Sequence, residues 1–284
     1  MMFKILFSIA FSLVTVLNCF SQDTDQTIGI GDKHFESDQI TEALYAYQRA
    51  VFFSPSGADP DVLLKIADCF VREGDFEKSI EYFDHAYYAD PDDSIKIEIL
   101  FRKANSFIQT NNFHFALIEL LGIKTEGGSL LEKRRALYLA SAYYGLENYS
   151  NAESHFLKAL PITEFDSREA IAKIFSKKSN FYRPNPKAAF WMSVFLPGSG
   201  QLYSGDWGAG INSFILTGSL AALTIYLTKL YHPIDAILTV LPWFQRYYQG
   251  GFGQAERIAE LQRERKRSET YQELLTIVSK AIEN

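Results

Sequence analysis

The feature that most constrains the fold is a repeat with a period of 36 or 37 residues. Four segments each begin with a small residue, and these starting positions are 36, 37 and 36 residues apart. A large apolar side chain follows each small residue by four positions. The small residues are Ala43, Ser79, Ala116 and Ala152, and the large ones are Tyr47, Phe83, Leu120 and Phe156. Because residues i and i+4 share one helix face, the pattern predicts four copies of one helical unit.

A second series of small residues lies twelve positions upstream of the first. These residues are Gly31, Ala67, Ala104 and Ala140, and His34, Phe70, Phe107 and Tyr143 follow them by three positions. Two helices of a pair approach closely only where their side chains are small. One pair cannot bury its apolar face alone, so pairs stack on one another. The sequence therefore predicts an all-α solenoid of helical hairpins.

The repeat resembles the tetratricopeptide repeat family over residues 24–164. Pro55 and Pro91 stand where that family ends its second helix. The third copy departs from this pattern, because Ile123 stands where the other copies have Ala50, Ala86 and Ala159, and Gly127-Gly128 replaces the proline. The aromatic side chains of the repeats are interpreted as core; these are Tyr45, Tyr47, Phe83, Tyr87, Tyr88, Tyr143 and Tyr144. A further helix over residues 167–181 is expected to continue or cap the stack.

The resemblance implies binding of a protein or peptide partner in a groove that the first helix of each pair lines. Six polar residues on the first helices are candidates for this groove: Lys33, Lys65, Arg72, Arg102, Lys103 and Asn105. The alternative is that these side chains belong to an ordinary solvated face.

The N-terminus predicts export. Lys4 precedes an apolar run over residues 5–17, small residues follow, and a cut before Gln22 would release residues 1–21 as a signal peptide. An uncleaved anchor helix and a lipoprotein that uses Cys19 are the alternatives. After cleavage Cys69 would be the one remaining cysteine, and its apolar neighbours favour a buried role.

Charge is distributed unevenly along the chain. Residues 22–165 carry 13 Lys and Arg against 24 Asp and Glu, whereas residues 166–284 carry 14 against 10. The acidic first part argues against nucleic acid, because phosphate binding needs a basic surface. The mildly basic second part fits contact with anionic lipid head groups.

Two long uncharged runs predict a membrane domain in the last third of the chain. Residues 188–205 and 207–228 contain no charged side chain, and the second run is long enough to cross a bilayer. Basic residues flank both ends of the region, which fits an even number of crossings without choosing the side. The alternative is a buried helical hairpin in a soluble protein.

The glycine-rich stretch between the two runs matches no catalytic motif. Pro197 and Gln201 stand where a G-x-S-x-G elbow needs glycine, and Asp206 stands where a phosphate loop needs lysine. The dinucleotide pattern fails at Tyr203. We therefore expect no enzyme activity, and neither cofactor nor metal.

The same stretch is similar to a small, poorly characterised bacterial membrane domain with a P-G-x-G-Q-x-Y-x-G motif, over residues 186–252. The matching residues are Pro197, Gly198, Gly200, Gln201, Tyr203 and Gly205. That resemblance implies a location and no reaction. We interpret the stretch as a turn at the membrane face, in which Gln201 satisfies backbone groups that the break leaves open.

After Gly250-Gly251 the chain is expected to form a separate amphipathic helix over residues 253–284. Its apolar stripe comprises Ile258, Leu261, Leu274, Leu275, Val278 and Ile282. The expected domains are thus a signal peptide (1–21), a repeat domain (22–182), a hydrophobic membrane domain (183–252) and this helix. The sequence as a whole predicts an envelope adaptor that is anchored in a membrane and presents its repeats in the periplasm. The alternatives are a membrane enzyme or transport component acting through the C-terminal domain, and a soluble periplasmic repeat protein.

Overall fold

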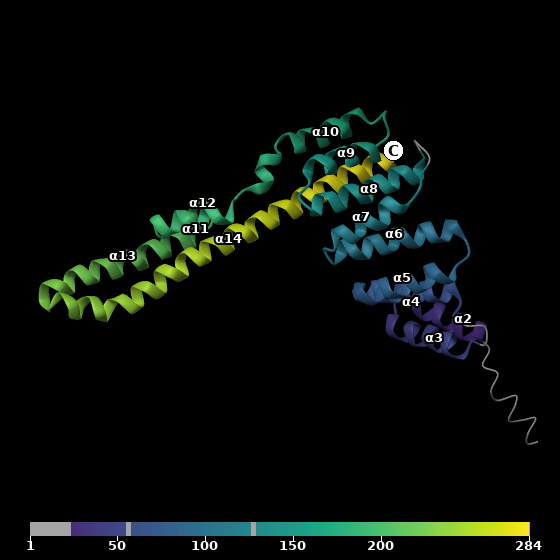
Figure 1. Ribbon diagram of the computed structural model, residues 1–284, viewed down its shortest axis with the longest axis horizontal. Helices are drawn as coiled ribbons and strands as arrows, with labels where there is room; N and C mark the ends of the chain where they lie inside the picture. Colours follow the sequence, from purple (N-terminus) through teal and green to yellow (C-terminus); the bar gives the residue numbers. More distant parts are fainter. Residues whose placement is uncertain (1–23, 55–57, 126–128, 284) are drawn as a thin grey trace, which may run out of the picture. The chain divides into compact units, whose positions relative to one another are not determined.

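The computed structural model describes residues 24–54, 58–125 and 129–283 (Figure 1). Within these ranges the chain forms thirteen α-helices, one short 3-10 helix and no strand. The expected signal peptide, Pro55 and Gly127-Gly128 lie outside the described residues. The chain divides into two compact units between Ala159 and Leu160.

The first unit is an array of four helical hairpins. Each hairpin pairs a first helix with a second, and each second helix also contacts the next first helix. The pairs are α2 (Thr24–Glu36) with α3 (Ile40–Phe53), α4 (Pro60–Glu73) with α5 (Phe76–Ala89), α6 (Asp93–Gln109) with α7 (Phe113–Gly122), and α8 (Leu130–Gly145) with α9 (Tyr149–Ala159). The all-α hairpin array expected from the repeat is confirmed.

Local signals set the ends of the best-defined hairpin. Asp59 caps α4 by accepting the Asp61 N–H at 3.0 Å, and Pro60 occupies the first turn, where a missing N–H costs nothing. Gly74 ends α4 with a φ of 79°, a left-handed conformation that favours glycine. Asp75 then accepts the Lys78 N–H and starts α5. Two residues therefore reverse the chain between α4 and α5.

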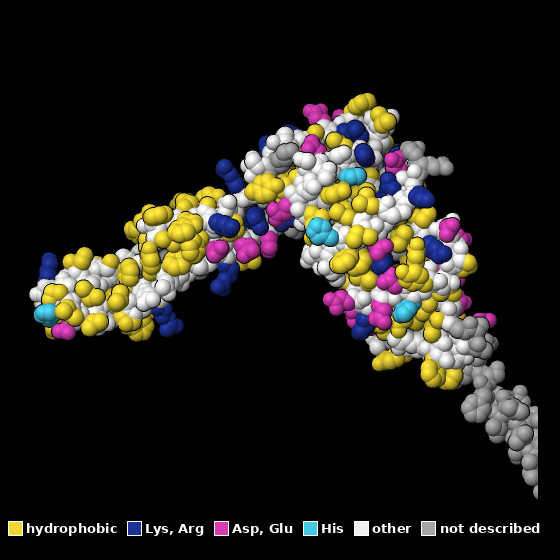
Figure 2. Space-filling model, viewed as in Figure 1, with side chains coloured by type: hydrophobic (Ala, Val, Ile, Leu, Met, Phe, Trp, Pro, Cys, Tyr) yellow, Lys and Arg dark blue, Asp and Glu magenta, His cyan; other side chains and the backbone are white. Residues whose placement is uncertain are grey.

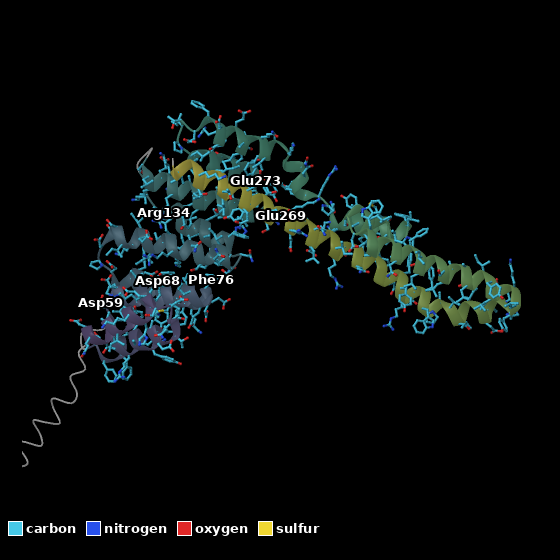
Figure 3. All side chains as sticks on the ribbon, turned by 180° about the vertical axis from the view of Figure 1, so that it is seen from behind. Asp59, Asp68, Phe76, Arg134, Glu269 and Glu273 are labelled. Carbon is cyan, nitrogen blue, oxygen red and sulfur yellow. The ribbon has the colours of Figure 1, made fainter. Side chains whose placement is uncertain are left out.

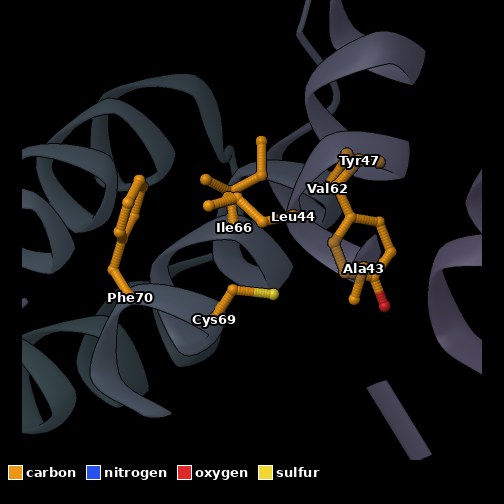
Figure 4. Close-up of a cluster of buried hydrophobic side chains, with 7 residues drawn as sticks. All are labelled: Ala43, Leu44, Tyr47, Val62, Ile66, Cys69 and Phe70. Carbon is orange, nitrogen blue, oxygen red and sulfur yellow. The ribbon is translucent and has the colours of Figure 1, made fainter. Parts of the chain in front are cut away.

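The small residues of both series are buried where helices cross. Gly31, Ala67, Ala104 and Ala140 are buried on the first helices, and Ala43, Ser79, Ala116 and Ala152 are fully buried on the second. Figure 4 shows the first of the resulting core clusters, in which Ala43, Leu44 and Tyr47 of α3 face Val62, Ile66, Cys69 and Phe70 of α4. The register predicted from the repeat is correct.

Two of the aromatic side chains interpreted as core are on the surface. Tyr45 is 68% exposed and Tyr88 is 83% exposed, because each points away from the helix face that its neighbours bury. In the irregular third copy, Ile123 follows the last residue of the short helix α7 and is buried. A large side chain fits there because it lies beyond the helix crossing.

The second unit begins with α10 (Phe165–Ser176) and the 3-10 helix η1 (Lys178–Tyr182). Both contact the long helix α14 (Pro233–Glu283), so they belong to this unit. This differs from the expected domain boundary at residue 182, which assigned these residues to the repeats. The remaining helices are α11 (Pro186–Phe195), α12 (Ser199–Tyr203) and α13 (Trp207–Leu230).

The expected break after the membrane segment is absent, because α14 is one helix of 51 residues that runs through Pro242 and Gly250-Gly251. The glycine at 251 permits close packing instead, since a Cβ there would lie 2.8 Å from the Ser213 hydroxyl of α13. The expected apolar stripe is only partly correct. Leu274 and Val278 are buried, whereas Leu261 and Ile282 are more than half exposed.

Candidate functional site

A ladder of ion pairs joins successive first helices of the repeats. Asp32 of α2 contacts Lys65 of α4 at 2.6 Å, and Asp68 of α4 contacts Arg102 of α6 at 2.7 Å. Glu98 of α6 then contacts Arg134 of α8 at 2.5 Å. These side chains are about 35–40% exposed. We call the solvent-facing side of α2, α4, α6 and α8 the first-helix face; Asp68 and Arg134 are labelled on it in Figure 3.

Ion pairs engage four of the six residues expected to line a groove. Lys65 and Arg102 belong to it, and Arg72 contacts Asp38 at 3.6 Å. Lys103 instead points toward the second helices, where it contacts Asp84 at 2.6 Å and Glu119 at 2.7 Å. Lys33 is exposed and Asn105 is half-buried. The sequence analysis did not predict these pairs. A signal for them is present in the sequence, because each pair joins an acid and a base that are 33 to 36 residues apart, about one repeat.

Burial and pairing act in opposite directions on the acids of the ladder. The hydrogen bond from Arg134 lowers the pKa of Glu98 and outweighs partial burial. Burial raises the pKa of Asp32, but hydrogen bonds from Lys65 and Tyr47 outweigh it, so the net shift is downward. For Asp68, burial is the larger effect, and its pKa is raised despite Arg102. In the ladder, pairing therefore stabilises the charged form of Asp32 and Glu98, whereas burial destabilises the charged form of Asp68.

Cys69 lies under this face as a free, fully buried thiol. Burial, with Asp68 and Glu73 nearby, raises its pKa to about 12. A thiol with such a pKa is not a nucleophile at neutral pH. The structural role inferred from its apolar neighbours agrees with this environment.

The glycine-rich motif of the second unit forms a compact turn with a polar centre. Pro197 and Gly198 occupy the middle of a turn in which the Ser199 N–H donates to the Leu196 carbonyl at 3.0 Å. Gly198 has a φ of 88°, as the third position of a type II turn requires. The short helix α12 follows at once, so the motif is a turn and a helical turn rather than a simple loop.

Gln201 is the centre of this turn and is fully buried. Its side-chain oxygen accepts from the Ser193 hydroxyl of α11 at 2.9 Å, and its amide donates to the Gly251 carbonyl of α14 at 2.7 Å. The Ser193 hydroxyl in turn accepts the Gly200 N–H at 2.9 Å. Gln201 therefore cross-links α11, α12 and α14, whereas the sequence argument assigned it to backbone groups freed at the break.

Two glycines of the motif allow this close packing. A Cβ on Gly200 would lie 2.0 Å from the Ala189 carbonyl oxygen of α11, and one on Gly198 would lie 2.1 Å from the Gly210 carbonyl oxygen of α13. Tyr203 accepts the Asn185 N–H with its hydroxyl at 3.2 Å and so ties α12 to the start of α11. Gly205 has a φ of 91° in the turn before α13. The motif residues thus hold the helices of this unit together.

The antiparallel pair formed by α13 and the first part of α14 carries an exposed apolar surface (Figure 2). Among the described helices, α13 is the one long and apolar enough to cross a bilayer, and only 17% of its most apolar window is buried. Exposed large side chains cover both helices; they are Trp207, Ile211, Phe214, Ile215, Leu223, Ile225, Tyr226 and Leu230 on α13, and Ile234, Ile237, Leu238, Leu241, Trp243 and Tyr247 on α14. A core helix of a soluble protein would be covered instead.

Charges mark both ends of this pair. Asp206 lies at the start of α13, where its carboxylate caps the helix by accepting the Ala209 N–H at 2.9 Å. Lys229, His232 and Asp235 lie at the opposite end, around the connection to α14. With 24 residues at about 1.5 Å each, α13 is about 36 Å long. This length is enough to cross the hydrocarbon core of a bilayer, which is about 30 Å thick.

Comparison with known proteins identifies one repeat of the first unit. A family model described as the tetratricopeptide repeat matches residues 60–93, which are α4, α5 and the start of α6. No curated protein matches the chain. The chain therefore contains a tetratricopeptide repeat, and three further hairpins of the same construction surround it. In the described part of the chain, no group of His, Cys, Asp and Glu side chains is arranged to hold a metal ion.

Proposed function

We propose that the protein is a membrane-anchored adaptor that binds a protein partner on the first-helix face of its repeats. Tetratricopeptide repeats bind protein or peptide segments, and this array presents four first helices side by side. The observation that carries the anchoring is the exposed apolar surface of α13 and α14. In water such an exposed apolar surface would promote aggregation, whereas in the hydrocarbon core of a bilayer it is stable.

The partner segment is proposed to be basic. Lys65, Arg102 and Arg134 of the first-helix face are paired with Asp32, Asp68 and Glu98, so these three cations are not available to clamp a carboxylate. Residues 22–165 carry 24 acidic against 13 basic side chains, which attracts a cationic segment over the length of the array. Association should therefore weaken as the salt concentration rises.

The resemblance of residues 186–252 to a bacterial membrane domain supports a membrane location, and the expected signal peptide at residues 1–21 supports a periplasmic location for the repeats. The buried Gln201 network is suited to that location, because hydrogen bonds between helices replace those that water would supply. The membrane enzyme or transport alternative would need ionisable groups that face one another inside the bundle. Asp206 serves instead as the N-cap of α13.

The anchoring is tested by extraction. The full chain should stay with membranes after an alkaline carbonate wash and enter solution with detergent. A variant in which Ile211, Ile215 and Ile225 become serine should lose this retention, while serine at the exposed repeat residues Phe52, Phe53 and Tyr88 should not. Wild-type protein that stays in solution without detergent would refute the membrane anchor.

The binding face is tested by photo-crosslinking in intact cells. A photoreactive amino acid replaces Lys33 on a first helix or, as the matched control, Tyr88 on a second helix. We expect a discrete adduct from position 33 that diminishes at high salt, and none from position 88. Adducts at position 88 alone would place the partner on the other side of the array.

A further inference from the structure

One charged side chain of α14 lies far from both ends of the apolar pair that α13 and α14 form. Arg246 is 13 residues, or about 20 Å, from Pro233, where α14 begins. In the other direction it is five residues, or about 8 Å, from Gly251, which packs against Ser213 of α13. Ser213 is six residues, or about 9 Å, from Trp207, where α13 begins. Arg246 therefore lies near the middle of the pair, although in the sequence it follows an uncharged run.

The chain supplies no acid that could neutralise Arg246 at this level. Arg246 is exposed, and within the described residues it forms no hydrogen bond, ion pair or ring contact. Between Trp207 and Gly253 the sequence has one acidic residue, Asp235, which is 11 residues, or about 16 Å, from Arg246 along α14. Both ends of the pair also lie beyond the reach of an arginine side chain, so the guanidinium does not reach the lipid head groups. A charge in the middle of a bilayer is costly unless it is paired, so the anion must come from another molecule.

The helix face that carries Arg246 is open to a close neighbour. Gln249 and Gly250 follow Arg246 by three and four positions, so they share its face, and both are exposed. A Cβ on Gly250 would meet nothing within 4 Å, whereas one on Gly251 would meet the Ser213 hydroxyl. Packing within the chain thus explains Gly251 but not Gly250. In membranes, glycine lets a second helix approach closely, and glutamine forms hydrogen bonds between helices.

We propose that the Arg246 face, comprising Arg246, Gln249 and Gly250, binds a membrane-spanning helix of another protein that carries an aspartate or glutamate near its middle. The charge complementarity selects an acidic helix, and the open glycine allows it to approach. A second copy of this chain would bring another arginine to the same level and no acid, whichever way it crosses the bilayer. This inference rests on the proposed membrane anchor.

The proposal is tested with synthetic transmembrane peptides and the full chain, reconstituted together in phosphatidylcholine vesicles. The peptide is a polyleucine helix of about 20 residues with lysines at its ends and glutamate, glutamine or leucine at its centre. Energy transfer from the labelled chain to the labelled peptide measures association, at a peptide density too low for peptides to pair with each other. We expect the glutamate peptide to bind about tenfold more tightly than the glutamine peptide, and the leucine peptide to show only random collision.

Variants assign the binding to the Arg246 face. Arg246→Glu should abolish binding of the glutamate peptide and create binding of a peptide with a central lysine, because the two charges are exchanged. Gly250→Leu should weaken binding of the glutamate peptide by about tenfold, because its side chain would hold the peptide away. The matched control is Gly218→Leu on α13, where a Cβ also meets nothing within 4 Å, and it should leave the affinity unchanged.

Two measurements separate this inference from the membrane anchor. Alkaline carbonate that removes the chain from the vesicles would refute both together. A maleimide that does not cross lipid, present on both sides of the membrane, should label Lys229→Cys at the end of the pair and should not label Gln249→Cys above the wild-type background. A retained chain in which both cysteines react equally fast would leave the anchor intact and overturn this inference, because the Arg246 face would then lie in water.

Two other results would overturn the proposal for a chain that stays in the membrane. The first is equal binding of the glutamate and leucine peptides, which would show that the arginine does not select a carboxylate. The second is association of wild-type copies with one another that Gly250→Leu abolishes, which would assign the face to a second copy of this chain.

Discussion

The side-chain amide of Gln201 donates to the backbone carbonyl of Gly251, 2.7 Å away and fifty residues further along the chain. Gly251 lies in the middle of α14, so this single contact joins the glycine-rich turn to the longest helix. Gln201→Leu should remove it together with the bond to Ser193, and should lower the free energy of unfolding by about 1–3 kcal/mol. Thermal unfolding of the full chain in detergent measures the change. The exposed Gln249→Leu is the control, and an equal loss there would show that the network adds nothing specific.

The glycines of the second unit should differ sharply in their tolerance of a methyl group. Gly200→Ala places a Cβ 2.0 Å from the Ala189 carbonyl oxygen, so α11 and α12 must move apart. Gly218→Ala meets nothing within 4 Å and improves helix propensity by about 0.5–1 kcal/mol. We expect Gly200→Ala to unfold at a clearly lower temperature than wild type and Gly218→Ala to unfold at the same or a higher temperature. Equal melting temperatures would contradict the close packing of the motif.

Overfilling a helix crossing of the repeats should destabilise the first unit. Ala86 is fully buried among Leu63, Phe83 and Ile99, and Ala86→Leu adds volume where no space exists. The expected cost is about 1–3 kcal/mol. The exposed Ala89→Leu on the same helix should change stability by less than about 0.5 kcal/mol. Denaturant unfolding followed by circular dichroism compares them, and an unchanged Ala86→Leu would disprove the repeat register.

Stability of the repeats should fall as the pH drops below 6.5. Burial lowers the pKa of His155 from its ordinary value of 6.5, and its Nδ1 is buried without a hydrogen-bond partner. The folded state therefore holds His155 neutral while the unfolded chain takes up a proton, so stability is complete above 6.5 and is lost below it. His155→Phe should flatten this dependence in denaturant titrations across the range. His155 stacks on Tyr143, so phenylalanine preserves the ring contact.

The exposed His85 provides the control for this pH dependence. His85 lies on α5 with its side chain 61% exposed, near Glu81 at 3.8 Å. Replacing it by glutamine should leave the slope of stability against pH below 6.5 close to that of the wild type. If His85→Gln flattens the slope as much as His155→Phe does, burial of His155 is not the cause.

The sequence by itself determined the repeat unit of this protein. The small residues at a spacing of 36 or 37 predicted where helices cross, and Ala67, Ala86 and Ala104 are all fully buried at such crossings. This was predictable because two helices can cross closely only where side chains are small. The same helical positions recur in every repeat, so small residues at these positions appear in the sequence as a fixed period. The two uncharged runs and the missing catalytic motifs are likewise properties of the linear chain.

The tertiary structure alone decided which charges meet and where the last helix begins. Lys65 and Arg102 were predicted to line a groove, whereas the structure pairs them with Asp32 and Asp68. The sequence analysis did not predict these pairs, because each one joins helices that are far apart in the chain. Gly250 and Gly251 resembled a helix end, yet α14 continues through them. Local propensity disfavours glycine in a helix, but contact with α13 and the hydrogen bond from Gln201 outweigh a cost of about 1 kcal/mol per residue. Contacts between distant segments, which no local pattern records, therefore decided the arrangement of this unit.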